Sequence, residues 1–183
     1  SLSKRDFSRV SNPLSKFGVK FKLKNNKNLP LTIHGTEKLK SIVFEETKGS
    51  AQCKSSVMFA GMRANGTTII RARKSRNHTE LLCKYLDLPI IIKNKKNIDE
   101  IKVKKVFNIK PLKYDIPSDI SSSAFFIVLT ALTQNSKLKI NNININPSRT
   151  GILTILKMMK VKIRVINKRV YKGERIVDLV IYG

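Results

Sequence analysis

Hydrophobic residues are spaced along this chain in two alternating ways, one typical of amphipathic helices and one typical of strands. Over residues 6–17 the apolar side chains recur on one helical face, although Pro13 is expected to kink that helix. The same spacing predicts further helices over 51–64, 77–86, 121–133 and 147–159. Alternation or short apolar runs predict strands over 19–23, 29–33, 39–44, 67–71, 89–93, 138–142, 161–166 and 175–182, with one or two more within 98–113. This succession indicates an α/β protein.

The order of the predicted elements repeats in the two halves of the chain. Residues 114–119 interrupt this order, and the succession of helix, strand, helix and strand then starts again. The stretch 55–59, for example, matches the stretch 122–126. We therefore predict repeated units arranged in two domains, 1–116 and 117–183, with the opening helix and strand as the tail of an earlier unit.

Two of the predicted helices begin with residues that favour an anion. The stretches 49–56 and 75–80 place hydroxyls, amides and the guanidinium of Arg76 where a helix starts. A helix start exposes unpaired backbone N–H groups and the positive end of the helix dipole. Two such starts in one domain predict a pocket for a small phosphorylated molecule.

Other polar residues near helix starts are expected to have structural roles. Asn146 suits the N-cap position of the last predicted helix, and Pro147 suits its first turn. The Phe125–Phe126 pair is expected in the core. Structural roles are also expected for Lys54, Asp119 and Arg149.

The chain is strongly basic, with 37 lysine and arginine residues against 12 acidic ones and a net charge of +25. Such a charge favours polyanions, nucleic acid included. The lysines are nevertheless spread along the whole chain and accompanied by many Asn and Ile residues, which indicates a bias towards A/T-rich codons. Since no basic stripe or aromatic interleaving accompanies the charge, nucleic-acid binding is the less favoured interpretation.

Cysteine and histidine usage gives no metal-binding pattern. Cys53 and Cys83 belong to no ligand cluster, and the only histidines are His34 and His78. Two reduced thiols are typical of a cytoplasmic protein. No apolar run reaches the roughly 18–20 residues of a membrane span, and no signal peptide is recognisable. Because the first residue is not methionine, the chain is expected to start inside a longer protein.

Five stretches in order along the chain carry a resemblance to a known family: SLSKR at 1–5, SAQCKS at 50–55, SRNHTE at 75–80, PSDISSSAFF at 117–126 and NPSRTG at 146–151. They resemble motifs of the enolpyruvyl transferases, in the branch that uses shikimate 3-phosphate. The resemblance implies a fold of two lobes, each built from three βαβαββ units. This chain would form a partial two-lobe piece, with family units missing before Ser1 and after Gly183.

The resemblance also implies an activity and its site residues. The family moves the enolpyruvyl group of phosphoenolpyruvate onto the 5-hydroxyl of shikimate 3-phosphate and releases phosphate, in aromatic amino acid biosynthesis and without a cofactor. The family's catalytic carboxylates would lie beyond Gly183, so this piece alone is expected to be inactive. By the resemblance, shikimate 3-phosphate is bound by Ser50, Ala51, Gln52, Ser75 and Arg76, and phosphoenolpyruvate by Arg5 and Gln52.

Other interpretations stay open on the sequence alone. Ser50 could serve only as a helix N-cap, and Arg76 only as a solvated surface residue. The protein could be a basic nucleic-acid-binding module, or the sister transferase that acts on UDP-N-acetylglucosamine. The sequence predicts neither glyphosate sensitivity nor oligomeric state, although a partial protein would expose normally buried surfaces, which favours dimerisation or poor solubility.

Overall fold

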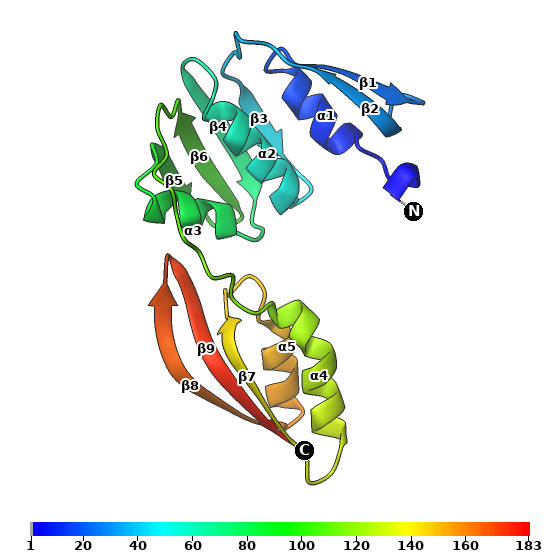
Figure 1. Ribbon diagram of the computed structural model, residues 1–183, viewed down its shortest axis with the longest axis vertical. Coiled ribbons are helices and arrows are strands. Elements are labelled where there is room, and N and C mark those ends of the chain that lie inside the picture. The colour runs from blue at the N-terminus through cyan, green and yellow to red at the C-terminus, as the bar shows by residue number, and fades with distance from the viewer. Residues whose placement is uncertain (1) are drawn as a thin grey trace. The chain divides into compact units, whose positions relative to one another are not determined.

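The computed structural model, which describes residues 2–183, contains two compact units (Figure 1). The first unit runs up to Ser75 and resumes over Leu86–Ile109, and the second comprises Arg76–Tyr85 and Lys110–Gly183. The second unit therefore contains one helix, α3 (His78–Tyr85), that lies between two strands of the first unit in the sequence. The assignment of 1–116 and 117–183 to two lobes of a larger protein stays a prediction.

The first unit opens with a short 3₁₀ helix (Leu2–Lys4), helix α1 (Ser8–Ser15) and an antiparallel ribbon of β1 (Lys20–Lys24) and β2 (Asn28–His34). Pro13 lies inside α1, as predicted, and has no N–H to donate to the carbonyl oxygen of Arg9. The thiol of Cys53 donates to that oxygen instead, at 3.1 Å. This bond fixes the start of helix α2 (Ala51–Gly61) against α1.

The rest of the first unit is a four-stranded sheet with α2 across one face (Figure 1). Its strands are β3 (Val43–Glu46), β4 (Thr67–Arg73), β5 (Ile90–Asn94) and β6 (Ile98–Lys104), in the order β3-β4-β6-β5. Only β3 and β4 are parallel. Apolar residues of α2, β4 and β6 form the buried interior, namely Val57, Met58, Ile70, Ile101 and Val103.

The second unit is a three-stranded antiparallel sheet with two helices on one face (Figure 1). The helices are α4 (Ile120–Leu132) and α5 (Gly151–Met158), and the strands β7 (Lys137–Asn144), β8 (Lys162–Tyr171) and β9 (Glu174–Tyr182) follow the order β7-β9-β8. The core between helices and sheet consists of Ile120, Ile127, Ile143, Leu156, Val177, Leu179 and Ile181.

The predicted repetition of βαβαββ units is confirmed. Elements β3-α2-β4-α3-β5-β6 form one complete unit in sequence order. The second copy is α4-β7-α5-β8-β9, preceded by Ser118, which makes a single parallel bridge to Ile143 where β3 would pair with β4. The opening α1-β1-β2 has the helix-strand-strand order that ends such a unit.

Two predicted element starts were wrong. The strand predicted over 39–44 lies at Val43–Glu46, because the backbone of Leu39 and Lys40 bonds to Asn65 and Phe17 instead of β4. Helix α5 begins at Gly151 and not at Pro147. The side chain of Asn146 accepts a hydrogen bond from the N–H of Ser148 at 3.0 Å, which folds residues 147–150 as a turn before the helix.

The prediction that Phe125 and Phe126 belong to the core was also wrong. Their side chains are 81% and 63% exposed, whereas the neighbouring Ile127 is fully buried. The core side of α4 is therefore the face of Ile120 and Ile127. A second apolar face of this helix points away from the sheet.

Candidate functional site

The first predicted anion-binding segment lies at one edge of the first unit's sheet, next to the end of β4. Strands β3 and β4 are parallel, with Glu46 opposite Ala72, so the segments that follow them leave the sheet at the same edge. Ligands of α/β proteins commonly bind at such an edge. A Cβ atom added to Gly49 would lie 3.7 Å from the carbonyl oxygen of Lys74, which shows how closely the loop before α2 approaches the residue that follows β4.

Ser50 is the N-cap of α2. Its Oγ accepts a hydrogen bond from the N–H of Cys53 at 3.3 Å, and its carbonyl oxygen accepts one from the N–H of Lys54 at 3.0 Å. A serine hydroxyl that accepts a capping bond can still donate its own proton. The N–H groups of Ala51 and Gln52 belong to the first turn, where a helix lacks internal acceptors and its dipole is positive. This start can therefore offer several donors to one anion.

A cavity of about 780 Å³ lies beside the start of α2, inside the first unit. It brings together three of the residues predicted for the site: Arg5, Ser50 and Gln52. The lining does not include the other three, Ala51, Ser75 and Arg76. Sequence reasoning missed two further cations in the lining, Arg9 and Lys48. The available indication was that Arg9 follows Arg5 by only four residues in the sequence.

The carboxylates that line this cavity are engaged with other groups. Hydrogen bonds from Ser8 hold the pKa of Asp6 below its usual range. Glu45 pairs with Arg71 at 3.0 Å, and Glu46 accepts two backbone N–H bonds. Burial raises the pKa of the Cys53 thiol, with Glu46 adding to the rise, so the thiol stays protonated at neutral pH.

The cations that line the cavity differ from its carboxylates in their ion pairing. Within residues 2–183, no carboxylate lies within 4.0 Å of the side-chain nitrogens of Arg5, Arg9 or Lys48. Three positive charges next to a helix N-terminus, none in a close ion pair with a described carboxylate, suit a polyanionic ligand.

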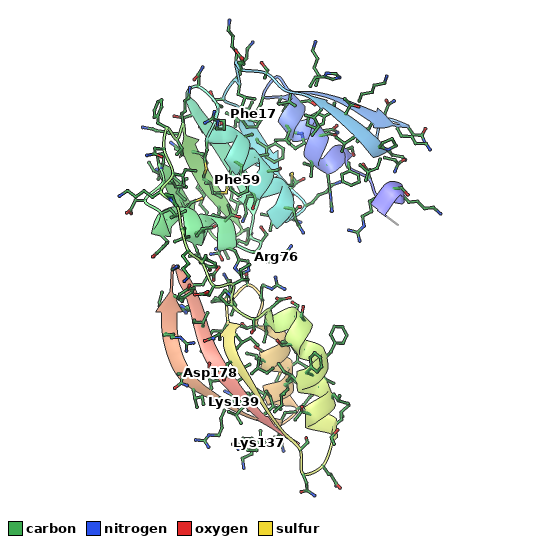
Figure 2. The ribbon with its side chains drawn as sticks, in the orientation of Figure 1. Phe17, Phe59, Arg76, Lys137, Lys139 and Asp178 are labelled. Atoms are coloured by element: carbon green, nitrogen blue, oxygen red, sulfur yellow. The ribbon has the colours of Figure 1, made fainter. Side chains whose placement is uncertain are left out.

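Ser75 and Arg76 fall on either side of the division between the two units. Ser75 follows β4 in the first unit, and its Oγ is buried without a hydrogen-bond partner among the described residues. Arg76 begins the second unit, in the segment that leads to α3, and is half-buried (Figure 2). Their roles as ligands of shikimate 3-phosphate stay predictions.

Polar residues of the second unit stabilise its local structure. Asp119 caps α4 and pairs with Arg149 at 2.7 Å. The amide of Asn146 donates to Asn77 Oδ1 at 2.8 Å. His78 lies with Nδ1 2.5 Å from Glu174 Oε1, and is thus packed within this unit.

Asp178 lies in the central strand β9 of the second unit (Figure 2). Its carboxylate accepts hydrogen bonds from the N–H of Asn142 at 2.9 Å and from the amide of Asn167 at 2.8 Å. These bonds, with help from nearby Arg169, hold its pKa below the usual range. A carboxylate engaged in this way supports the sheet.

Two further observations concern the part of the chain that the structure describes. No group of three or more His, Cys, Asp and Glu side chains in it is arranged to hold a metal ion. None of its helices has both the length and the apolar character needed to cross a membrane.

The fold recurs in solved structures of one class of protein. The enolpyruvyl transferase NikO from Streptomyces tendae is 18% identical and superposes with a TM-score of 0.63, over 96% of this chain and 42% of that one. An EPSP synthase from Acinetobacter baumannii is 34% identical, with a TM-score of 0.83 over 100% of this chain and 41% of that one. The fold is therefore that of the enolpyruvyl transferases.

Sequence comparison narrows the class to one family. The 3-phosphoshikimate 1-carboxyvinyltransferases of Petrotoga mobilis and Desulforamulus reducens are 40% and 38% identical over 99% and 100% of this chain. The family model of EPSP synthase (3-phosphoshikimate 1-carboxyvinyltransferase) matches residues 1–177, and the chain belongs to this family. It spans 42% of the length of each of these two relatives.

Proposed function

We propose that this chain provides the shikimate 3-phosphate side of the site of a 3-phosphoshikimate 1-carboxyvinyltransferase. The whole protein would transfer the enolpyruvyl group of phosphoenolpyruvate to the 5-hydroxyl of shikimate 3-phosphate and release phosphate. The observation that carries the proposal is the cavity at the start of α2, in which Arg5, Ser50 and Gln52 lie together. Family membership supports the choice of substrates. A cytoplasmic location agrees with the two free thiols, Cys53 and Cys83.

The roles we assign follow from the chemistry of the two substrates. Both are polyanions, and their approach requires donors and positive charge that screen each phosphate from the other. Ser50 Oγ and the N–H of Ala51 would donate to the phosphate of shikimate 3-phosphate, with Ser75 and Arg76 completing its binding. Gln52 would contact the ring and the phosphoenolpyruvate side, where Arg5 would pair with that substrate.

These residues bind and orient, and none of them is assigned a proton transfer. Among the residues that the structure describes, no carboxylate of the cavity is placed to act as general acid or base, because Asp6, Glu45 and Glu46 are held by Ser8, Arg71 and the loop backbone. We therefore expect binding by this chain alone, without turnover. Release of phosphate from the two substrates above a protein-free blank would contradict that expectation.

Calorimetric titration with shikimate 3-phosphate tests the proposal. We expect saturable binding near one site per chain, and the variant Arg76→Ala should reduce the affinity at least about ten-fold, as expected for loss of a charge-assisted pair to phosphate. Inorganic phosphate at matched ionic strength is the control ligand, and Arg73→Ala, which removes an exposed arginine of β4 outside the cavity, is the control variant. Equal affinity for the two ligands would contradict the proposal.

One observation favours a second candidate function, binding of nucleic acid. The outer face of the second unit's sheet carries a basic cluster around Tyr182, to which Lys137 and Lys139 contribute from β7 (Figure 2). The ammonium groups of Lys137 and Lys162 lie 5.6 Å and 5.2 Å from the centre of the Tyr182 ring. Binding of a DNA duplex with a steep dependence on salt, without preference for shikimate 3-phosphate, would favour this alternative.

A further inference from the structure

Glu46 is a buried acidic residue at the end of β3, directly before the start of α2. It is 5% exposed, although glutamate is rarely buried unless it has partners. Its Oε1 accepts a hydrogen bond from the N–H of Lys48 at 3.0 Å, and its Oε2 accepts one from the N–H of Gly49 at 2.7 Å. One carboxylate thus binds two consecutive backbone donors of the loop that leads to Ser50.

The loop between Glu46 and Ser50 depends on these bonds. It contains only Thr47, Lys48 and Gly49, and Gly49 has a φ of +69°, in the left-handed region that residues with a Cβ rarely adopt. Without the carboxylate, two partly buried N–H groups would lose their acceptor, and the loop would be free to turn away. The carboxylate of Glu46 is therefore bonded to the backbone that leads into α2.

We propose that Glu46 is a positioning residue for the anion site, which fixes the loop of residues 47–49 so that Ser50 and the first turn of α2 face the cavity. This inference rests on the proposed function, since the anion in question is shikimate 3-phosphate. Glu46 would not touch the ligand. It acts through the backbone of Lys48 and Gly49.

The direction in which the affinity for the anion changes separates a positioning role of Glu46 from simple electrostatic repulsion. A carboxylate in the lining of a cavity repels a bound phosphate, so removing its charge would by itself tighten anion binding. A positioning residue has the opposite effect, because losing it disperses the donors that the anion needs. The variant Glu46→Gln has almost the same size, loses the charge, and presents an NH₂ group to one of the two N–H donors.

The experiment measures the affinity of the 183-residue chain for shikimate 3-phosphate in wild type and Glu46→Gln. We expect Glu46→Gln to bind about ten-fold more weakly, in line with losing a hydrogen bond to a charged group. The matched control is Glu45→Gln, which removes the same charge from the adjacent, exposed residue and should bind slightly more tightly. Equal or tighter binding by Glu46→Gln would overturn the inference.

Two further measurements keep the outcomes distinct. Circular dichroism checks that Glu46→Gln is folded; if it is not, Gly49→Ala replaces it, since that variant strains the same loop without altering any charge. Weaker binding by Gly49→Ala supports the inference, and unchanged binding contradicts it. If the wild-type chain binds no shikimate 3-phosphate, the proposed function fails and the positioning role falls with it. If the wild type binds and Glu46→Gln binds equally well, only the positioning role fails.

Discussion

At the scale of single residues, Ser50 combines a structural and a binding role that substitutions can separate. Its Oγ accepts the capping bond from Cys53, while its proton is available to a ligand. Aspartate is as good an N-cap as serine and adds a favourable charge at the positive end of the helix, but it would repel a phosphate.

We therefore predict that Ser50→Asp keeps the thermal stability of the chain and abolishes binding of shikimate 3-phosphate. Ser50→Ala should instead lower the free energy of unfolding by about 1 kcal/mol, as caps generally do. The measurements are thermal unfolding and calorimetry, with Ser56→Ala as the control because the hydroxyl of Ser56 donates to the carbonyl of Cys53 within α2. Retained binding in Ser50→Asp would show that Ser50 is a cap and nothing more.

Asp178 gives a prediction about pH. Its pKa is lowered in the folded chain, chiefly by the N–H of Asn142 and the amide of Asn167. Because the pKa is lowered on folding, Asp178 contributes its full stabilisation at pH values above its unfolded-state pKa, about 3.9. This stabilisation is lost as the pH falls through the folded-state pKa. We expect Asp178→Asn to be less stable than wild type at pH 7, with the difference shrinking as the pH falls below about 4.

Urea unfolding at a series of pH values from 7 downward measures this difference. The comparison with wild type cancels the pH-dependent contributions of the other acidic residues to stability, because their pKa values change little when Asp178 is replaced by a residue of the same shape. A difference in stability that does not change with pH would contradict an ionised structural role for Asp178.

At the scale of elements, α4 and α5 each carry two apolar faces. One face of each helix packs on the sheet of the second unit. The other is exposed and consists of Phe125, Phe126, Leu129 and Leu132 on α4 with Ile155, Met158 and Met159 near α5. A helix that is apolar all round is generally buried, so this outer face is suited to contact with further protein.

Adjacent residues of α4 give a matched test of the two faces. We predict that Phe126→Ala changes the free energy of unfolding by less than about 0.5 kcal/mol, as expected at an exposed site. Ile127→Ala should lower it by about 2–5 kcal/mol, because Ile127 is fully buried. Phe126→Ala should also reduce fluorescence of a dye that binds exposed apolar surface. Equal destabilisation by the two variants would contradict the assignment of faces.

The same elements show which features of the fold can be predicted from the sequence. Periodicity located the helices and most strands, because burial of one face imposes a spacing that is visible locally. It could not locate the start of α5 at Gly151, which depends on a turn closed by Asn146. It also could not tell the two apolar faces of α4 apart, since both look like core until the sheet is present.

The candidate site shows the same limit. Ser50 and Gln52 were predicted because helix starts and family motifs are local in the sequence. Glu46, Arg9 and Lys48 were missed because their place in the cavity depends on how the loop after β3 and the helix α1 come together. An acidic residue at the end of a strand gives no local indication that its carboxylate binds the backbone of the following loop.

At the scale of the whole molecule, the net charge of +25 predicts weak, unspecific binding to any polyanion. We expect affinity for a DNA duplex to fall steeply as salt rises from 50 to 200 mM, because binding releases many counterions. Affinity for shikimate 3-phosphate should fall much less, since a small ligand releases few. Titrations with both ligands at several salt concentrations measure the two slopes, and similar slopes would contradict a formed site.

The central claim is that the start of α2 holds the phosphate of shikimate 3-phosphate, and an NMR titration of the ¹⁵N-labelled chain tests it most directly. The account predicts saturable shifts of the backbone amides of Ser50, Ala51 and Gln52, larger than those caused by inorganic phosphate at the same concentration. Shifts spread over the lysines of the surface, without saturation and without preference between the two ligands, would contradict it.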